Sequence, residues 1–546
     1  MRRDRLSWLF LSFLICFIYV YVNIVKLQYN KSDELSVIAD SQYTQKEWVS
    51  ELGYKLLDST RKDLLEYVTK YNAVILPNIF IRNNTEVERE EVLKLIYILK
   101  NYDEEYDLSE GQLSGESQKL YFPVDKETYE KLKRIKDVKG FYVYSYEEID
   151  RSEGWKIENI LSSTRNLMDN SLKNSNSLEM QIQEKVKDNK RPYREFVLDM
   201  DGDITVKENN EEKLNRNILL TVDRNFQDEI KEILNDKYKD YEQIGVIVLE
   251  SKTGKIEAMV QKNDKLPNVN IGAETLNGFF PGSIFKTIIL EGVLEEGKVS
   301  LGEKLTCEGL YESKKDKDKI GHGELTVEEA YVVSCNDIYS QLGNRLGEDK
   351  LMELLKGQNI FSKVLGFEKE QKGALESKEL KVEDGSLGIT AIGQNIRITP
   401  LQAVGIVNTI INEGIYIRPQ LVMAMIDKDG KVIEEYKTNS ERVISEETSE
   451  KIKKVMKKVV NEGTGIRAKV EGAEVGGKTG STERMENGEK FSDGWFIGYF
   501  NKEDKYYTAV VFVKNINKDS ESGGSTAAPI FGDIVKIKKG DFKAAN

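Results

Sequence analysis

Ser283 and Lys286 lie three residues apart in the segment 281–286, PGSIFK. Apolar residues recur at helical spacing after this segment, so both side chains are expected on one helix face, in the first turn. A lysine beside apolar residues near the positive end of a helix dipole should lose affinity for its proton, and it could then act as a base toward the serine. The pair is therefore a candidate nucleophile and base that needs no histidine. The structural alternative is an N-capping serine followed by a surface lysine.

A second motif, Ser334-Cys335-Asn336, follows residues 326–329, TVEE, which have the form of a capping box at the start of a short helix. A serine and an amide close to the end of that helix could pass a proton to a leaving group and hold a substrate carbonyl. A tripeptide of this composition is weak evidence when it is taken alone.

The third motif is GGKTGST, residues 476–482, on a predicted strand. Lys478 offers a fixed positive charge, the hydroxyls of Thr479 and Ser481 offer contacts to a carboxylate, and Gly480 allows another backbone to approach. The alternative is an ordinary strand with a glycine bend. A phosphate-binding loop is not predicted, because these glycines do not connect a strand to a helix.

The scarcity of histidine and cysteine excludes several kinds of site. His322 is the only histidine, so a zinc site built on several histidines is excluded and a Ser-His-Asp hydrolase would have to use this residue. With three cysteines, the chain can form neither a disulfide framework nor a four-cysteine metal site. The formal net charge is −13, so no nucleic-acid partner is expected.

Cys307 and Cys335 are a possible redox pair, because they are the two cysteines outside the first apolar segment. A disulfide between them is entropically feasible in a compartment that lacks the thiol-reducing pools of the cytosol. Because Cys335 lies between Ser334 and Asn336, such a bond would move both neighbours and make activity depend on an external reductant. The alternative is that both cysteines are buried small hydrophobes that never meet.

Residues 6–25 are almost entirely apolar, and as a helix they are long enough to span the ~30 Å core of a bilayer. Arg2, Arg3 and Arg5 precede them, so the positive-inside rule predicts a cytoplasmic N-terminus and an extracytoplasmic remainder. No cleavage site of small residues follows, so we expect an uncleaved single-pass anchor rather than a signal peptide.

The glycines divide the rest of the chain, since few of the 41 precede residue 211. Residues 27–210 are predicted to form a mixed α/β domain, with helices at 87–99 and 126–135 and strands at 74–76 and 141–144. A polar linker is expected at 208–213.

In residues 215–546, strands predicted from both ends of the region enclose a helical block that continues to about residue 465. These strands are at 244–249, 255–260, 477–482, 495–500 and 507–513, with a hairpin turn at Asn487-Gly488. The predicted fold class is therefore α+β with an antiparallel sheet. The run KKDKDK at 314–319 is expected to be a solvated loop.

The order and separation of the three motifs resemble the penicillin-binding protein and serine β-lactamase superfamily, whose S-x-x-K and K-T-G motifs flank a serine-containing triplet. The resemblance covers about residues 217–535. Further matching segments are NILLTVD at 217–223, His322-Gly323, GQ at 393–394, ITPLQ at 398–402 and AAPIF at 527–531. The anchor, the length of residues 27–210 and a short match at 177–180 (SLEM) make the class B penicillin-binding proteins the most similar group. A class A protein would carry a glycosyltransferase whose histidine-containing signature this chain lacks.

The resemblance implies a penicillin-binding, transpeptidase-type domain after an N-terminal pedestal, and a peptidoglycan D,D-transpeptidase activity. Ser283 would attack the D-Ala-D-Ala carbonyl of a stem peptide with Lys286 as base, and the N–H groups of Ser283 and Ser481 would form the oxyanion hole. Ser334 and Lys478 would relay a proton and Asn336 would hold the peptide. The substrate-binding group would be Thr479, Gly480, Ser481 and Thr482.

The same resemblance implies stem peptides, β-lactam antibiotics and membrane-embedded cell-wall synthesis proteins as partners, a location in the bacterial cell membrane, and no metal or organic cofactor. Two alternatives stay open from the sequence. One is a D,D-carboxypeptidase, which shares every motif. The other is a membrane-anchored penicillin-binding sensor or scaffold without turnover.

Overall fold

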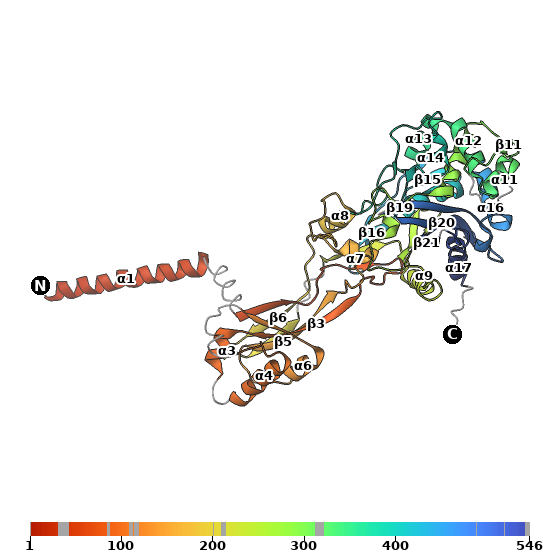
Figure 1. Ribbon diagram of the computed structural model, residues 1–546. Coiled ribbons are helices and arrows are strands. Elements are labelled where there is room, and N and C mark those ends of the chain that lie inside the picture. Colours follow the sequence, from red (N-terminus) through yellow and green to blue (C-terminus); the bar gives the residue numbers. More distant parts are fainter. Residues whose placement is uncertain are drawn as a thin grey trace. The chain divides into compact units, whose positions relative to one another are not determined.

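The computed structural model describes residues 2–30, 43–84, 88–108, 113, 119–199, 201–208, 214–311, 321–486, 489–517 and 519–540 (Figure 1). The chain forms two compact units, each assembled from several segments. The first contains Met1–Gly53, Tyr67–Ile149 and Asn189–Leu214, and the second contains Tyr54–Glu66, Asp150–Asp188 and Asn215–Asn546.

This division differs from the single boundary predicted between residues 27–210 and 215–546. Tyr54–Glu66 and Asp150–Asp188, both from the predicted N-terminal domain, belong to the second unit. β2 (Leu56–Leu57) pairs in parallel with β8 (Arg216–Leu220), which adds it to the order β17-β16-β8-β2. Such pairings join residues that are far apart in the sequence, so local composition could not reveal them.

Helix α1 (Arg2–Asn30) confirms the predicted N-terminal apolar helix. Its stretch Ser7–Lys26 is the one helical segment in the described part of the chain that is long and apolar enough to cross a membrane. None of this stretch is buried against the rest of the protein. The helix therefore has the composition and exposure of a membrane anchor.

The first unit contains two antiparallel three-stranded sheets and confirms the predicted α/β composition. One sheet has the order β4-β3-β5 and the other β1-β6-β7. Helices α4 and α6 pack on the first sheet around Ala73, Leu95 and Leu132, while Tyr142 stacks on Phe196 between the sheets. The elements of this unit are β1 (Thr44–Trp48), β3 (Tyr67–Ile75), α3 (Pro77–Asn83), α4 (Arg89–Tyr102), β4 (Leu120–Val124), α6 (Lys126–Leu132), β5 (Phe141–Ile149), β6 (Tyr193–Leu198) and β7 (Ile204–Glu208).

A five-stranded antiparallel sheet forms the centre of the second unit and confirms the sheet predicted from strands at both ends of this region. Its order is β10-β9-β21-β20-β19. The strands are β9 (Gln243–Glu250), β10 (Lys255–Gln261), β19 (Val475–Glu486), β20 (Glu489–Lys502) and β21 (Lys505–Ile516). Strand β19 pairs with β20 alone, so it is an edge strand of this sheet.

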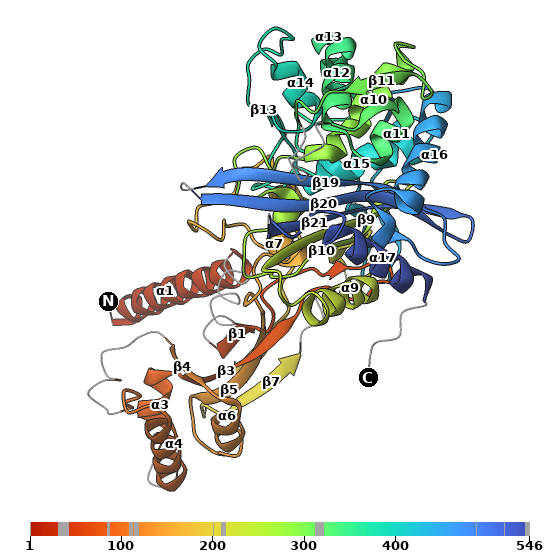
Figure 2. The same ribbon diagram turned by 45° about the vertical axis from the view of Figure 1, so that its right-hand side comes forward.

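Helices cover both faces of this sheet, as Figure 2 shows. On one face α9 (Arg224–Asp236) and α17 (Ala527–Lys539) bury Ile230, Phe531 and Ile534 against the strands. The helical block lies on the other face, where α15 (Pro400–Ile411) and α16 (Glu446–Glu462) pack on the strands. The predicted insertion of helices between the strands is confirmed.

The remaining elements of the second unit complete the block and its small sheets. They are α7 (Ile157–Ser162), α8 (Leu178–Lys185), η2 (Val269–Ile271), η3 (Gly282–Phe285), α10 (Lys286–Glu295), β11 (Lys304–Cys307), β12 (Gly323–Thr326), α11 (Val327–Val332), α12 (Asn336–Leu346), α13 (Glu348–Gly357), β13 (Ala374–Leu375), α14 (Ser386–Ala391), β14 (Ile396–Arg397), β15 (Ile415–Ile417), β16 (Val422–Asp427), β17 (Val432–Glu435), β18 (Ser440–Arg442) and η4 (Ile466–Ala468). The predicted turn at 487–488, the loop at 314–319 and most of the linker at 208–213 lie outside the described residues.

Candidate active site

Ser283 lies in η3, a short 3₁₀ turn that continues directly into α10, so the predicted helix begins with a tighter turn than expected. The preceding residue, Gly282, has a φ of 55°, and a Cβ there would lie 2.8 Å from the carbonyl oxygen of Ser481. Only glycine combines this conformation with that contact. The Ser283 motif therefore sits directly against the strand that carries the third motif.

Lys286, the first residue of α10, is completely buried and points at the second motif. Its Nζ donates hydrogen bonds to Ser334 O and Asn336 Oδ1, both at 2.6 Å, and to Ser334 Oγ at 3.3 Å. Ser283, three residues earlier in the chain, is partly exposed. The predicted base is thus held beside the second motif in the free protein.

Lys478 reaches the same serine from the opposite side. Its Nζ donates to Ser334 Oγ at 2.8 Å, and the side chain is completely buried on β19. The Ser334 hydroxyl therefore connects Lys286 and Lys478, which come from the first and third motifs. Of the predicted catalytic residues, Lys286, Ser334, Asn336 and Lys478 are joined by hydrogen bonds, and the turn that carries Ser283 lies against the strand of Lys478.

The two buried lysines share a protein environment that disfavours two positive charges. Burial, followed by the charge of Lys286, lowers the pKa of Lys478 well below its ordinary value of 10.5. Such a pair favours holding one proton over two, so one amine can lose its proton more readily than an ordinary lysine does.

Two aromatic rings beside these lysines were not anticipated from the sequence. Lys286 Nζ lies 5.7 Å from the centre of the Tyr339 ring, and Lys478 Nζ lies 5.5 Å from the centre of the Tyr331 ring. Ring faces attract cations, so the two tyrosines offset part of the cost of burying positive charge. The sequence signal was their position, four residues before and four residues after Cys335.

Ser334 is held in an unusual backbone conformation between α11 and α12. Its φ is +62°, in the left-handed region that residues other than glycine seldom adopt. The turn is closed by the N–H of Cys335, which donates to Ala330 O at 2.8 Å, and Cys335 Sγ then caps α12 by accepting from the N–H of Ile338 at 3.5 Å. The capping box at Thr326 that was predicted to open α11 is confirmed.

The hydroxyl groups of the third motif are oriented by loops that the sequence did not single out. Thr479 Oγ1 lies 2.6 Å from Thr464 Oγ1, and Ser481 Oγ accepts from the N–H of Gly523 at 3.0 Å. Thr464 lies between two glycines, Gly463 and Gly465, a pattern typical of a turn. The glycine-rich run SGGST at 522–526 was the corresponding signal for Gly523.

Thr482 is the most deeply buried hydroxyl of the third motif, and its role in substrate contact stays a prediction. Side chains alternate along a strand, so Thr482 lies on the same face of β19 as Lys478, and it is buried while Ser481 is exposed. Its Cγ2 would lie 2.7 Å from a Cβ at Gly282. The side chain of Thr482 therefore packs against the Ser283 turn.

Gly480 allows the close approach of backbones that was predicted for it. A Cβ at this position would lie 2.7 Å from the carbonyl oxygen of Pro281, so Gly480→Ala forces β19 and the Ser283 turn apart. We expect a loss of about 1–3 kcal/mol in the free energy of unfolding, together with slower acylation by penicillin. Urea unfolding and acylation rates measure the two effects. Gly302→Ala is the matched control, because a Cβ at Gly302 meets nothing within 4 Å. Equal stability and acylation of the two variants would contradict this packing.

Comparison with known proteins identifies the family. A model described as the penicillin binding protein transpeptidase domain matches residues 244–536. Stage V sporulation protein D of Bacillus subtilis is 32% identical over 348 residues, which are 58% of this chain and 52% of that protein. Penicillin-binding protein PbpB of Mycolicibacterium smegmatis is 27% identical over 319 residues, 54% of this chain and 49% of that protein. The chain thus spans about half the length of these curated relatives.

Solved structures share the fold of nearly the whole chain. A peptidoglycan synthetase from Bifidobacterium adolescentis superposes with a TM-score of 0.62 and 17% identity, covering 92% of this chain and 97% of that one. Penicillin binding protein 3 from Mycobacterium tuberculosis, complexed with aztreonam, gives a TM-score of 0.59 and 18% identity, covering 91% and 97%. These relatives confirm the resemblance to class B penicillin-binding proteins. The family model covers more than half of the residues of this chain, and the chain therefore belongs to the penicillin-binding protein transpeptidase family.

Proposed function

We propose that the protein is a peptidoglycan D,D-transpeptidase that cross-links stem peptides through an acyl-enzyme on Ser283. The observation that carries this proposal is the convergence of Lys286 and Lys478 on the hydroxyl of Ser334, close to the Ser283 turn. This arrangement supplies a proton acceptor and a relay without histidine or metal ligands.

In the acylation step, Ser283 Oγ attacks the carbonyl carbon between the two D-alanines, and its proton passes to Lys286. When the tetrahedral intermediate collapses, the carbon–nitrogen bond breaks and a proton passes through Ser334 from the lysine pair to the departing amine. The free enzyme holds Lys286 on Ser334 and Asn336. Catalytic hydrogen bonds often tighten only when substrate binds. A second stem-peptide amine then attacks the ester, loses its proton to the lysine pair, and releases Ser283.

The geometry of β19 supports substrate binding at this strand. Because β19 is an edge strand, its free edge can pair with an extended peptide by strand addition. Ser481 is exposed there, and Thr479 is positioned by Thr464. We assign these two hydroxyls to the terminal carboxylate of the donor peptide and the N–H groups of Ser283 and Ser481 to its oxyanion. β-Lactams, as acyl donors, would enter the same site.

The pKa of Lys478 predicts the pH dependence of acylation. Below this pKa a second ammonium group would stand beside Lys286 and oppose uptake of the Ser283 proton, so the rate should rise with pH. The midpoint of that limb should lie below 10.5, because burial and then the charge of Lys286 lower the pKa of Lys478. Stopped-flow acylation by a penicillin, with unfolding followed over the same pH range, measures it. A rate that stays flat up to pH 10.5 would contradict the assignment.

Product analysis separates the proposed reaction from hydrolysis. The full-length protein is incubated with a stem pentapeptide ending in D-Ala-D-Ala and with an acceptor peptide that carries a free amine. The proposal expects a cross-linked product and free D-alanine in equal amounts, neither of which should form with Ser283→Ala. Trimmed tetrapeptide without cross-links would instead identify a D,D-carboxypeptidase. Acylation by penicillin without any product would identify a sensor or scaffold.

We further propose that α1 anchors the protein in the bacterial cell membrane, with its N-terminus in the cytoplasm and the transpeptidase domain outside. The exposed apolar stretch Ser7–Lys26 and the arginines before it support this orientation. Membrane-embedded cell-wall synthesis proteins are the partners that such an anchor would meet. Protease accessibility of the two ends of the chain in intact spheroplasts tests the orientation.

A further inference from the structure

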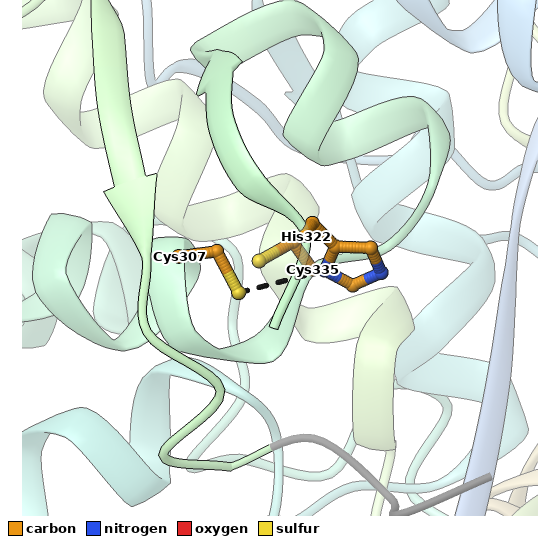
Figure 3. Close-up of side chains that lie close together, drawn as sticks. All are labelled: Cys307, His322 and Cys335. Carbon is orange, nitrogen blue, oxygen red and sulfur yellow. Dashed lines mark hydrogen bonds between the residues drawn. The ribbon is translucent and has the colours of Figure 1, made fainter. Parts of the chain in front are cut away.

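Cys307, His322 and Cys335 come together beside the second motif. Cys307 ends β11, His322 precedes β12, and the hairpin pairing places Cys307 opposite Gly323. Cys335 reaches the same point from the cap of α12. The two sulfur atoms and a ring nitrogen of His322 all lie within 4.8 Å of one another, and Figure 3 shows the three side chains gathered there.

We propose that these three residues form a binding site for a thiophilic transition metal ion, zinc in particular. Thiolate and imidazole are the ligands that zinc prefers in proteins. The distance between Cys307 Sγ and His322 Nδ1 is 3.5 Å. Zinc bound tetrahedrally at the usual zinc–sulfur and zinc–nitrogen lengths would place such ligand atoms about 3.6 Å apart. Cys307 and His322 therefore already stand at the separation that one shared ion requires, and Cys335 Sγ lies within 4.8 Å of both.

The exposure of the three side chains is suited to binding a metal ion. Cys307 is 2% exposed and Cys335 is fully buried, while His322 is exposed at the surface. An ion could thus enter from the histidine side, and a water molecule could supply a fourth ligand. The sequence excluded a zinc site built on several histidines and a metal site built on four cysteines. A site with two cysteines and one histidine is neither of these.

A metal site explains this arrangement better than the redox pair predicted from the sequence. The two sulfur atoms lie within 4.8 Å of each other, which contradicts the expectation that these cysteines never meet, and the two residues form no disulfide in the structure. A disulfide would need only the two cysteines and would leave the imidazole without a role. A shared ion uses all three groups.

The site connects directly to the catalytic motif, because Cys335 separates Ser334 from Asn336. Both neighbours accept hydrogen bonds from Lys286, and Ser334 holds its left-handed conformation at this point. A metal bound to Cys335 would fix this turn to the β11–β12 hairpin. Metal-free protein should therefore acylate about 10²-fold more slowly, the effect expected from a shift of ~1 Å in a reacting group. Equal rates for the two forms would overturn this connection.

The test of the site itself does not depend on activity. The full-length protein in detergent is loaded with zinc, dialysed, and analysed for metal by mass spectrometry, and a parallel sample is loaded with Co²⁺ for absorption spectroscopy. We expect one zinc ion per chain and thiolate-to-cobalt charge-transfer bands. Cys307→Ser and His322→Ala should each weaken zinc binding at least ~10²-fold, because even outer-shell partners of a zinc ligand are worth 10- to 100-fold.

Cys16→Ser is the matched control, since Cys16 is the exposed cysteine of α1 and should leave metal binding unchanged. His322→Ala keeps the test decisive if the cysteine variants fold poorly, because His322 is exposed. Zinc content that is equal in the wild type and His322→Ala, or absence of zinc and of cobalt bands from the wild type, would overturn the site.

Thiol counting distinguishes the metal from a disulfide. Protein isolated without reductant is denatured in the presence of a chelator and then titrated for thiols. If the three residues bind a metal, all three cysteines of the chain should react, because the chelator removes the ion from Cys307 and Cys335. Reaction of Cys16 alone until a reductant is added would show a disulfide between Cys307 and Cys335, and it would overturn the metal proposal.

Discussion

Ser283→Ala is expected to abolish covalent labelling by a fluorescent penicillin while the protein stays folded. The acyl group needs the oxygen that this substitution removes, and no other side chain stands at the same point of the η3 turn. The cost in stability should be about 1 kcal/mol or less, because Ser283 is partly exposed and lies within the η3 turn rather than at its N-cap, which is Pro281. Labelling followed by gel fluorescence, with mass mapping of the wild-type adduct, measures the effect.

Ser300→Ala is the control for this prediction. Ser300 is an exposed serine shortly after α10, so its loss should change neither labelling nor stability. Undiminished labelling of Ser283→Ala, or an adduct mapped to another residue of the wild type, would overturn the assignment of the nucleophile.

Lys286→Ala should slow acylation by about 10²- to 10⁴-fold, the usual contribution of a general base. The substitution also removes the donor to Ser334 O and Asn336 Oδ1, so both partly buried acceptors lose a partner and some stability is lost. Lys286→Met keeps the volume of the side chain without the amine. We expect Lys286→Met to be acylated as slowly as Lys286→Ala. It should be more stable than Lys286→Ala, because methionine fills more of the buried space. Stopped-flow acylation rates and urea unfolding of both variants separate catalysis from stability.

The control for Lys286 is Lys298→Ala. Lys298 also donates to two backbone carbonyls, those of Arg345 and Leu346, but it lies outside the site. Its loss should affect stability alone. If Lys286→Met acylates at the wild-type rate, Lys286 is not the base, and the proton of Ser283 must leave by another route.

Local patterns were sufficient for the elements and for the order of the chemical motifs. The apolar run that became α1, the hairpin of β9 and β10, and the strands β19 to β21 were all predictable, because side-chain periodicity and turn residues act over a few positions. The catalytic residues were recognisable for a related reason. Each motif is short, and its chemistry depends on residue types at fixed spacing.

Only the tertiary structure decided the contacts between residues that are distant in the sequence. The sequence did not assign Tyr54–Glu66 and Asp150–Asp188 to the second unit, because contacts such as the pairing of β2 with β8 have no local signature. Thr482 is buried because it lies on the face of β19 that is turned toward the Ser283 motif. The cysteines suggested a redox pair by their number and compartment. It was the β11–β12 hairpin and the cap of α12 that brought His322 to them, because a hairpin register and a helix cap are set by packing around them.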